Sequence, residues 1–199
     1  KNADIKVTYN SDNVENIKTR ERKISRFFEP LYKSVIINYD EMFETTEYQH
    51  GSYLFIYPED VTVAAYLQYL TNWKHQKGFE VVAASTAQTG STTSSIYDYI
   101  RNAYDTWPNP PEFICLVGDA DSPYSIPTGH YGNGEGDHYY TLLEGNDILA
   151  DAFIGRLSFN SYSELYTIIN KILHYEREPY FCLLYTSDAA DDMQCVDLG

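Results

Sequence analysis

One histidine and one cysteine are the side chains of this chain best suited to covalent chemistry. His130 lies in Gly129-His130-Tyr131-Gly132, where it could serve as the general base of a cysteine or serine hydrolase. Cys115 lies in the middle of the apolar run FICLV at residues 113–117. A thiol in such a run behaves as a small buried hydrophobic group rather than as a nucleophile. Cys115 is therefore predicted to be structural.

A second group of reactive side chains is acidic. Asp119 follows the apolar run, and the stretch EGNDILAD at residues 144–151 places Glu144, Asp147 and Asp151 around a glycine turn. Oxygen ligands that converge from a turn and a strand end are what a hard cation such as calcium requires. Spacing alone favours the simpler interpretation, a solvated acidic turn.

The overall charge excludes one class of partner. The 199 residues carry 29 Asp and Glu against 14 Lys and Arg, a formal net charge of −15. A general nucleic-acid-binding protein needs a basic face to neutralise phosphates, so no nucleic-acid partner is expected. No apolar run approaches the length of a membrane span. The chain starts at Lys1 without a signal-peptide pattern, so the start of the chain gives no localisation.

Residues 51–181 predict the elements that must position these side chains. Apolar runs near residues 53–57, 79–84 and 113–117 predict buried strands. Between them lie a helix that Asp60 caps and a second helix with an apolar face over residues 96–104. The β-α-β-α-β order implies a parallel sheet covered on both faces.

Three more elements are predicted to follow a long loop. They are a hairpin over residues 138–147, a strand in AFIGRL at residues 152–157, and a helix from about Tyr162 to Arg177. Ser161 and Glu164 form a capping box for this last helix. Its buried stripe consists of Leu165, Ile168, Ile169, Ile172 and Leu173.

The two ends of the chain have a different character. Residues 1–50 contain an alternating stretch at 5–9, typical of a half-buried strand, and an apolar stretch at 27–37 without sustained helical spacing. We interpret residues 1–50 as the end of a preceding β-rich domain with its linker. Residues 182–199 have no periodicity, and they can be back-translated into DNA that resembles a sequencing-library transposon adapter. We interpret them as adapter read-through; a genuine acidic tail is the alternative. Cys115 is then the only native cysteine, which leaves no disulfide or thiolate metal site.

Four blocks between residues 53 and 178 resemble, in order and spacing, blocks of the gingipain family of cysteine peptidases. They are NWKHQKGFEV, FICLVGD, EGND followed by FIGR, and NKILHYERE. Residues 1–50, with ISRFFEPLYKSVIINYDE, resemble the end of that family's prodomain. The resemblance implies a caspase-like α/β/α sandwich with a mainly parallel sheet, preceded by the end of a β-rich prodomain that contacts it. It also implies peptide-bond hydrolysis by a Cys/His dyad, a protein or peptide substrate, and a secreted or bacterial cell-surface location.

The resemblance assigns roles to individual residues. The family's catalytic His and Cys lie well after the FIGR block, so His130 is not the family's base. The chain is thus expected to hold the prodomain end (1–50) and the N-terminal half of the catalytic domain (51–181), and to be inactive by itself. The resemblance further implies a structural calcium. Its ligands would be the carboxylates of Asp119, Asp147 and Asp151 and the backbone carbonyls of Glu144 and Leu149.

Other roles stay open at this level. Asp137 and Tyr140 are expected to be structural, and Arg156 to pair with a carboxylate, either to steady a loop or as a surface ion pair. Two alternatives to the endopeptidase remain: a surface sortase-like transpeptidase of the same family, and a non-catalytic calcium-binding surface module.

Overall fold

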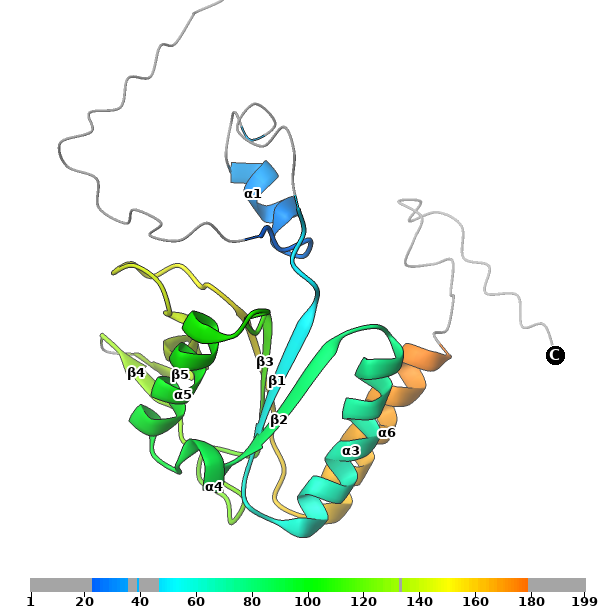
Figure 1. Ribbon diagram of the computed structural model, residues 1–199. Helices are drawn as coiled ribbons and strands as arrows, with labels where there is room; N and C mark the ends of the chain where they lie inside the picture. Colours follow the sequence, from blue (N-terminus) through cyan, green and yellow to red (C-terminus); the bar gives the residue numbers. More distant parts are fainter. Residues whose placement is uncertain (1–22, 36–38, 40–46, 133, 179–199) are drawn as a thin grey trace, which may run out of the picture.

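A four-stranded parallel sheet forms the centre of the molecule in the computed structural model, which describes residues 23–35, 39, 47–132 and 134–178 (Figure 1). The strands are β1 (Ser52–Tyr57), β2 (Glu80–Ser85), β3 (Phe113–Val117) and β6 (Phe153–Leu157), in the order β2-β1-β3-β6. Every neighbouring pair in this sheet is parallel. All four strands therefore start at one edge of the sheet, the amino edge, and end at the other, the carboxyl edge.

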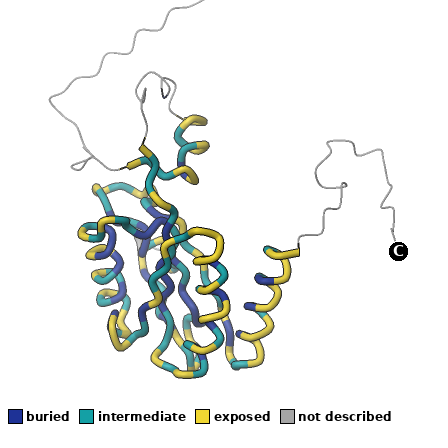
Figure 2. The backbone as a smooth tube through the Cα atoms, turned by 45° about the vertical axis from the view of Figure 1, so that its right-hand side comes forward, coloured by how far each residue is buried: buried dark blue, intermediate teal, exposed yellow. Residues whose placement is uncertain are grey.

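Helices cover both faces, which confirms the predicted α/β/α sandwich. On one face lie α3 (Val61–Gln76) and α6 (Tyr162–Arg177); on the other lie α4 (Thr86–Thr89), α5 (Thr93–Thr106) and the 3-10 helix η2 (Asp137–Thr141). Successive side chains of β3 point to opposite faces. Ile114 and Leu116 join the cluster under α5, whereas Val117 joins the cluster under α3 and α6. The central strands β1 and β3 are accordingly more buried than β2 and β6, and buried backbone runs through the middle of the sheet in Figure 2.

Side-chain caps start the two long helices where the sequence predicts them. Asp60 accepts hydrogen bonds through Oδ1 from the N–H groups of Thr62 and Val63, at 2.8 and 2.9 Å. Ser161 Oγ accepts from the N–H of Glu164 at 3.3 Å. The predicted return bond of that capping box goes elsewhere, because Glu164 Oε2 accepts from the N–H of Asn160 at 2.7 Å. None of the described helices is both long and apolar enough to cross a membrane.

The hairpin predicted at residues 138–147 is wrong. Residues 137–141 form η2, and the hairpin lies earlier, where β4 (Gly129–Tyr131) pairs antiparallel with β5 (Gly134–Gly136). Gly132 has a φ of 58° in that turn, a conformation that glycine adopts without strain. Residues 86–89, predicted as loop, form the short helix α4.

The N-terminal segment also differs from its prediction. Residues 29–35 form the helix α1 (Glu29–Val35), although the apolar spacing there indicated no helix. The predicted strand at residues 5–9 and the interpreted read-through at 182–199 lie outside the described residues. The boundaries at residues 50 and 181 remain predictions.

A charged cluster ties α3 to α6. Glu176 Oε1 lies 2.6 Å from Lys74 Nζ, and Oε2 accepts from Lys77 Nζ and Trp73 Nε1, each at 2.9 Å. Burial raises the pKa of Glu176, but the hydrogen bonds from Lys74, Lys77 and Trp73 outweigh it and lower the pKa to about 2. Because the pKa is depressed in the folded state, the carboxylate stabilises the fold above pH 4.5, and this contribution is lost as the pH falls toward 2.

Replacement of this carboxylate should therefore destabilise the protein. Glu176→Gln leaves the Lys74 ammonium, only 9% exposed, without its counter-charge, and should lower the free energy of unfolding by about 3 kcal/mol at pH 7. Urea denaturation at pH 7 and pH 3 measures the effect, which should shrink at the lower pH. The matched control is Glu178→Gln, because Glu178 pairs with His174 on the exposed surface of the same helix. An equal effect of the two substitutions would contradict this account.

Candidate functional site

The loop after β3 occupies the carboxyl edge of the sheet, where parallel α/β proteins place their functional groups. It starts at Gly118 and Asp119 and runs to the β4–β5 hairpin. Asp119 Oδ1 accepts from the N–H of Ala120 at 2.9 Å, and the carbonyl of Asp119 accepts from the N–H of Ile126 at 2.8 Å. The Asp119 carboxylate thus caps its own turn.

Arg156, near the end of β6, holds this loop. Its Nε and Nη2 donate to the two carboxylate oxygens of Asp137 at 2.9 and 2.6 Å. Its Nη1 donates to the carbonyls of Gly118 and Ile126 at 2.9 and 2.7 Å. One guanidinium therefore fastens both ends of the loop and the start of η2 to the sheet. Such a planar, bidentate arrangement is specific to arginine.

Tyr140 adds a second fastening. Its ring is fully buried, and its hydroxyl donates to the carbonyl of Pro127 at 2.6 Å. Asp137 and Tyr140 are thus structural, as the sequence predicts. The Arg156–Asp137 ion pair steadies a loop and is not an exposed surface pair. The four-way role of Arg156 is the feature that sequence reasoning missed. Its signal was the lone arginine at the end of an otherwise apolar strand.

The acidic stretch 144–151 lies at the other edge of the sheet, because it immediately precedes β6. Asp151 Oδ2 accepts from the N–H groups of Leu143 and Glu144, both at 2.8 Å. Asp147 Oδ1 accepts from the N–H of Leu149 at 2.8 Å. Burial raises the pKa of Asp151, the two N–H bonds lower it, and the negative charges of Glu144 and Asp147 raise it again. The charges of Glu144 and Asp147 thus disfavour ionisation of Asp151.

The structure consequently divides the five predicted calcium ligands. Glu144, Asp147, Leu149 and Asp151 share the loop at the amino edge, whereas Asp119 follows β3 at the carboxyl edge, with the parallel β3–β6 pair between them. A single ion coordinated by all five groups does not fit this arrangement. Among the described residues, no three His, Cys, Asp or Glu side chains already stand together as a metal site.

The two residues able to do covalent chemistry do not form a dyad in this structure. Cys115 packs in β3 against the cluster under α3 and α6, and burial raises the pKa of its thiol to about 12, although Lys74 and Arg156 lower it. A nucleophilic cysteine needs the opposite shift. His130 lies exposed on β4, opposite Glu135 in the hairpin register.

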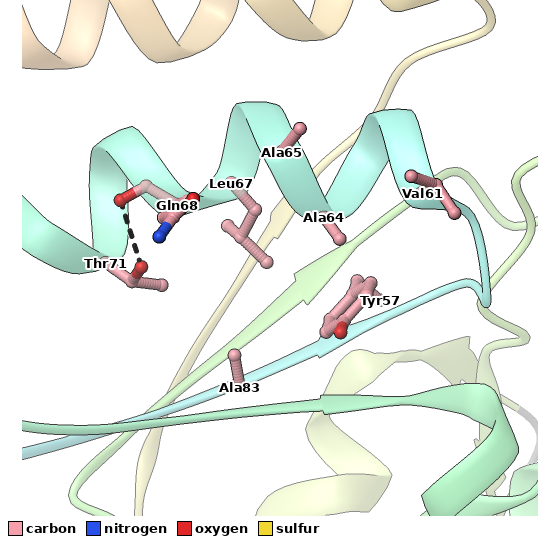
Figure 3. Close-up of a pocket in the computed structure, with 8 residues that line it drawn as sticks. All are labelled: Tyr57, Val61, Ala64, Ala65, Leu67, Gln68, Thr71 and Ala83. Carbon is pink, nitrogen blue, oxygen red and sulfur yellow. Dashed lines mark hydrogen bonds between the residues drawn. The ribbon is translucent and has the colours of Figure 1, made fainter.

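One hollow of 390 Å³ lies between α3 and the edge strand β2 (Figure 3). Its lining has no carboxylate, imidazole, thiol or amine; it consists of Tyr57, Val61, Ala64, Ala65, Leu67, Gln68, Thr71 and Ala83. The hydroxyl of Thr71 is already engaged with the carbonyl of Gln68 at 3.1 Å. This hollow therefore has little chemistry to offer.

Comparison with known proteins places the chain among cysteine peptidases. The family model described as "Peptidase family C25" matches residues 46–193, a range that runs beyond residue 181. Gingipain R2 of Porphyromonas gingivalis is 32% identical over 155 residues, which are 75% of this chain and 20% of that protein. Lys-gingipain of the same organism is 29% identical over 188 residues, 88% of this chain and 10% of that protein.

Solved structures agree with these matches. The crystal structure of the Arg-specific cysteine proteinase gingipain R has a TM-score of 0.56 at 24% identity, which supports the fold alone; 64% of this chain covers 28% of that one. The complex of the pro- and mature domains of RgpB from Porphyromonas gingivalis has a TM-score of 0.54 at 27% identity, with 63% of this chain covering 29% of that one. The chain thus spans about a fifth of the length of gingipain R2 and under a third of these solved chains.

Removal of the Arg156 anchor should loosen the carboxyl-edge loop. Arg156→Ala leaves a largely buried Asp137 and two carbonyls without their donor, and should lower the free energy of unfolding by about 3 kcal/mol. Arg156→Lys should recover only part of this loss, since an ammonium cannot reproduce the fork. Urea denaturation measures both, with Arg101→Ala as the control for an exposed arginine pair. If Arg156→Ala costs no more than Arg101→Ala, the anchor is not what holds the loop.

Proposed function

The chain belongs to peptidase family C25, and from this premise we propose that it is the first part of the catalytic domain of a secreted gingipain-like cysteine endopeptidase. The catalytic His and Cys of the whole protein then come from sequence that follows this chain. The observation that carries the proposal is the state of Cys115, a strand thiol whose pKa is about 12 and which cannot supply a thiolate near neutral pH.

In the whole enzyme, a cysteine thiolate would attack the carbonyl carbon of the peptide bond with a histidine as the base. The acyl-enzyme would form as the amine product leaves with the proton, and water would then release the acid. The residues of this chain would serve that reaction by position: Arg156 and Tyr140 would hold the carboxyl-edge loop rigid. A secreted or cell-surface location, a protein or peptide substrate, and contact between the prodomain and the catalytic domain belong to the same proposal.

The chain by itself should show no peptidase activity. Hydrolysis of an unbiased fluorogenic peptide library under reducing conditions should stay at the background rate, with wild type and Cys115→Ala indistinguishable. Thiol-sensitive turnover that Cys115→Ala or His130→Ala abolishes would overturn the assignment of the dyad to later sequence.

Extension of the chain along its natural gene should then yield hydrolysis that a thiol alkylator stops. Transfer of the acyl group to an added amine, instead of to water, would favour the transpeptidase. If neither hydrolysis nor acyl transfer occurs, the non-catalytic module is favoured.

We propose, in addition, that a structural calcium ion is bound by the amino-edge loop alone. The donor set there fits a hard cation in kind, because its side chains are all carboxylates and the pKa of Asp151 is raised, first by burial and also by its two acidic neighbours; binding would have to draw the three carboxylates together. Glu144, Asp147 and Asp151 would supply carboxylate oxygens, and Leu149 a backbone carbonyl. When bound, the ion would neutralise this repulsion and tie the loop to the start of β6.

Calcium should therefore raise thermal stability through the loop and not through Asp119. At a hundredfold excess of calcium over its dissociation constant, linkage adds about 2.7 kcal/mol to the stability of the folded state. The thermal midpoint in calcium and in chelator should differ for the wild type and for Asp119→Ala, but not for Asp147→Ala. Equal loss in both variants would show that Asp119 is a ligand after all, and no calcium effect in the wild type would remove the site.

A further inference from the structure

A short N-terminal segment lies across the amino edge of the sheet. Residues 23–35 and 47–50, here called the N-terminal cover, are joined by backbone bonds: Ile24 N–H donates to Glu47 O at 3.2 Å, and Gln49 N–H donates to Ile24 O at 2.9 Å. The amide of Gln49 also donates through Nε2 to the carbonyl of Pro110, directly before β3, at 3.1 Å. Figure 1 shows α1 beyond the starts of the strands, opposite the carboxyl-edge loop.

Two phenylalanines attach the cover to the strands. The ring of Phe27 meets the edge of the Phe113 ring with 4.8 Å between centroids, and Phe28 stacks on Phe153 with 4.1 Å between centroids. Phe28 is buried, but Phe27 remains 46% exposed and the apolar face of α1 contributes no buried residue. So small an apolar contact is worth only a few kcal/mol. One buried charge is enough to offset it.

Such a charge lies beneath the cover. Glu112, the residue before β3, is only 3% exposed, and neither of its carboxylate oxygens has a hydrogen-bond partner. Ser25 of the cover lies close enough to favour the carboxylate: its Oγ accepts from the N–H groups of Phe27 and Phe28, both at 3.1 Å, which leaves its single hydroxyl hydrogen for Glu112. Burial raises the pKa of Glu112 above its ordinary value of 4.5, and Ser25 and the backbone near Ser52 only partly offset this.

Among the residues that the structure describes, none of the groups that shift the pKa of Glu112 is a cation. Burial raises the pKa of Tyr32 in α1, and the charges of Asp151, Tyr39, Glu112 and Glu144 raise it further. The pKa of Tyr53 in β1 is raised mainly by burial, with Glu112 among the smaller causes. Lys33 of α1 pairs with Glu29 instead, at 3.0 Å.

We propose that the N-terminal cover is a pH-controlled device, which docks on the amino edge while Glu112 is protonated and loosens when Glu112 is ionised. A protonated carboxyl needs no counter-charge under the cover, whereas an ionised one regains water only if the cover lifts. No other part of the sheet has to move for this to occur.

The direction of the pH effect follows from linkage. The docked state binds the proton of Glu112 more tightly than the open state, in which the carboxyl is in water. Docking is therefore strongest below pH 4.5, weakens as the pH rises through the raised pKa, and becomes constant above it. Each unit by which docking raises the pKa corresponds to a tenfold change in the docking equilibrium.

Hydrogen exchange of the cover tests the proposal. The reporters are the amides of Tyr32, bonded to Phe28 O at 3.0 Å, and of Gln49, compared with the amides of β1 as a reference for the sheet. After correction for intrinsic exchange rates, protection of the two reporters should fall between pH 4 and pH 8 in the wild type while that of β1 stays level. In Glu112→Gln, which mimics the protonated carboxyl, cover protection should stay at its acid value throughout.

Two further variants complete the experiment. Glu59→Gln removes an exposed glutamate elsewhere and should reproduce the wild-type profile. Glu112→Ala removes the titrating carboxyl even if the glutamine is poorly accommodated, and should also give a profile independent of pH. Level cover protection in the wild type would overturn the proposal, and so would a wild-type decline that persists in both Glu112 variants.

Discussion

Parallel pairing of β3 with both of its neighbours decides where every other feature of this molecule lies. Because the strands share one direction, residues that precede a strand gather at one edge and residues that follow a strand gather at the other. Asp119 follows β3 and the acidic loop precedes β6. The length of the sheet therefore separates Asp119 from the acidic loop, although the family resemblance groups them as ligands of one ion. The same constraint places the N-terminal cover and the carboxyl-edge loop on opposite sides of a rigid platform.

One buried ionisable side chain lies at each edge, Arg156 at the carboxyl edge and Glu112 at the amino edge, and the two differ in how many hydrogen bonds they make. At the carboxyl edge, Arg156 donates four hydrogen bonds to Asp137 and two carbonyls, and such a well-bonded, largely buried cation fixes a loop. At the amino edge, Glu112 is as deeply buried but its oxygens lack hydrogen-bond partners, and in our proposal the cost of ionising it there makes docking of the covering segment depend on pH. In the proposed peptidase, the carboxyl edge would border the reacting groups, and the amino edge would meet the segment interpreted as the end of a prodomain.

The sequence was sufficient for the parts of the fold that rest on local pattern. Helices α3, α5 and α6 have apolar spacing over several turns, and Asp60 and Ser161 mark the starts of α3 and α6. Propensity, capping and burial therefore agree. The missed elements are short. Helix α1 has seven residues and η2 has five, and such lengths are set by tertiary contacts rather than by periodicity. The separation of Asp119 from Asp151 follows from the predicted parallel strands, because one residue follows β3 and the other precedes β6. The convergence of the Arg156 bonds on Gly118, Ile126 and Asp137 depends instead on tertiary contacts that no local pattern encodes. The family resemblance gave the residue types but not that geometry.

The central claim is that this part of a cysteine peptidase contains no reactive thiol of its own, and the ionisation of Cys115 tests it most directly. In a chain with Cys182 and Cys195 replaced by serine, the rate of alkylation by iodoacetamide can be followed from pH 6 to pH 10. With a thiol pKa of about 12, the native protein should react far more slowly than a free thiol at every pH, and urea should restore the ordinary rate. Rapid alkylation of the folded protein near neutral pH would contradict the account, since Cys115 would then be an activated nucleophile.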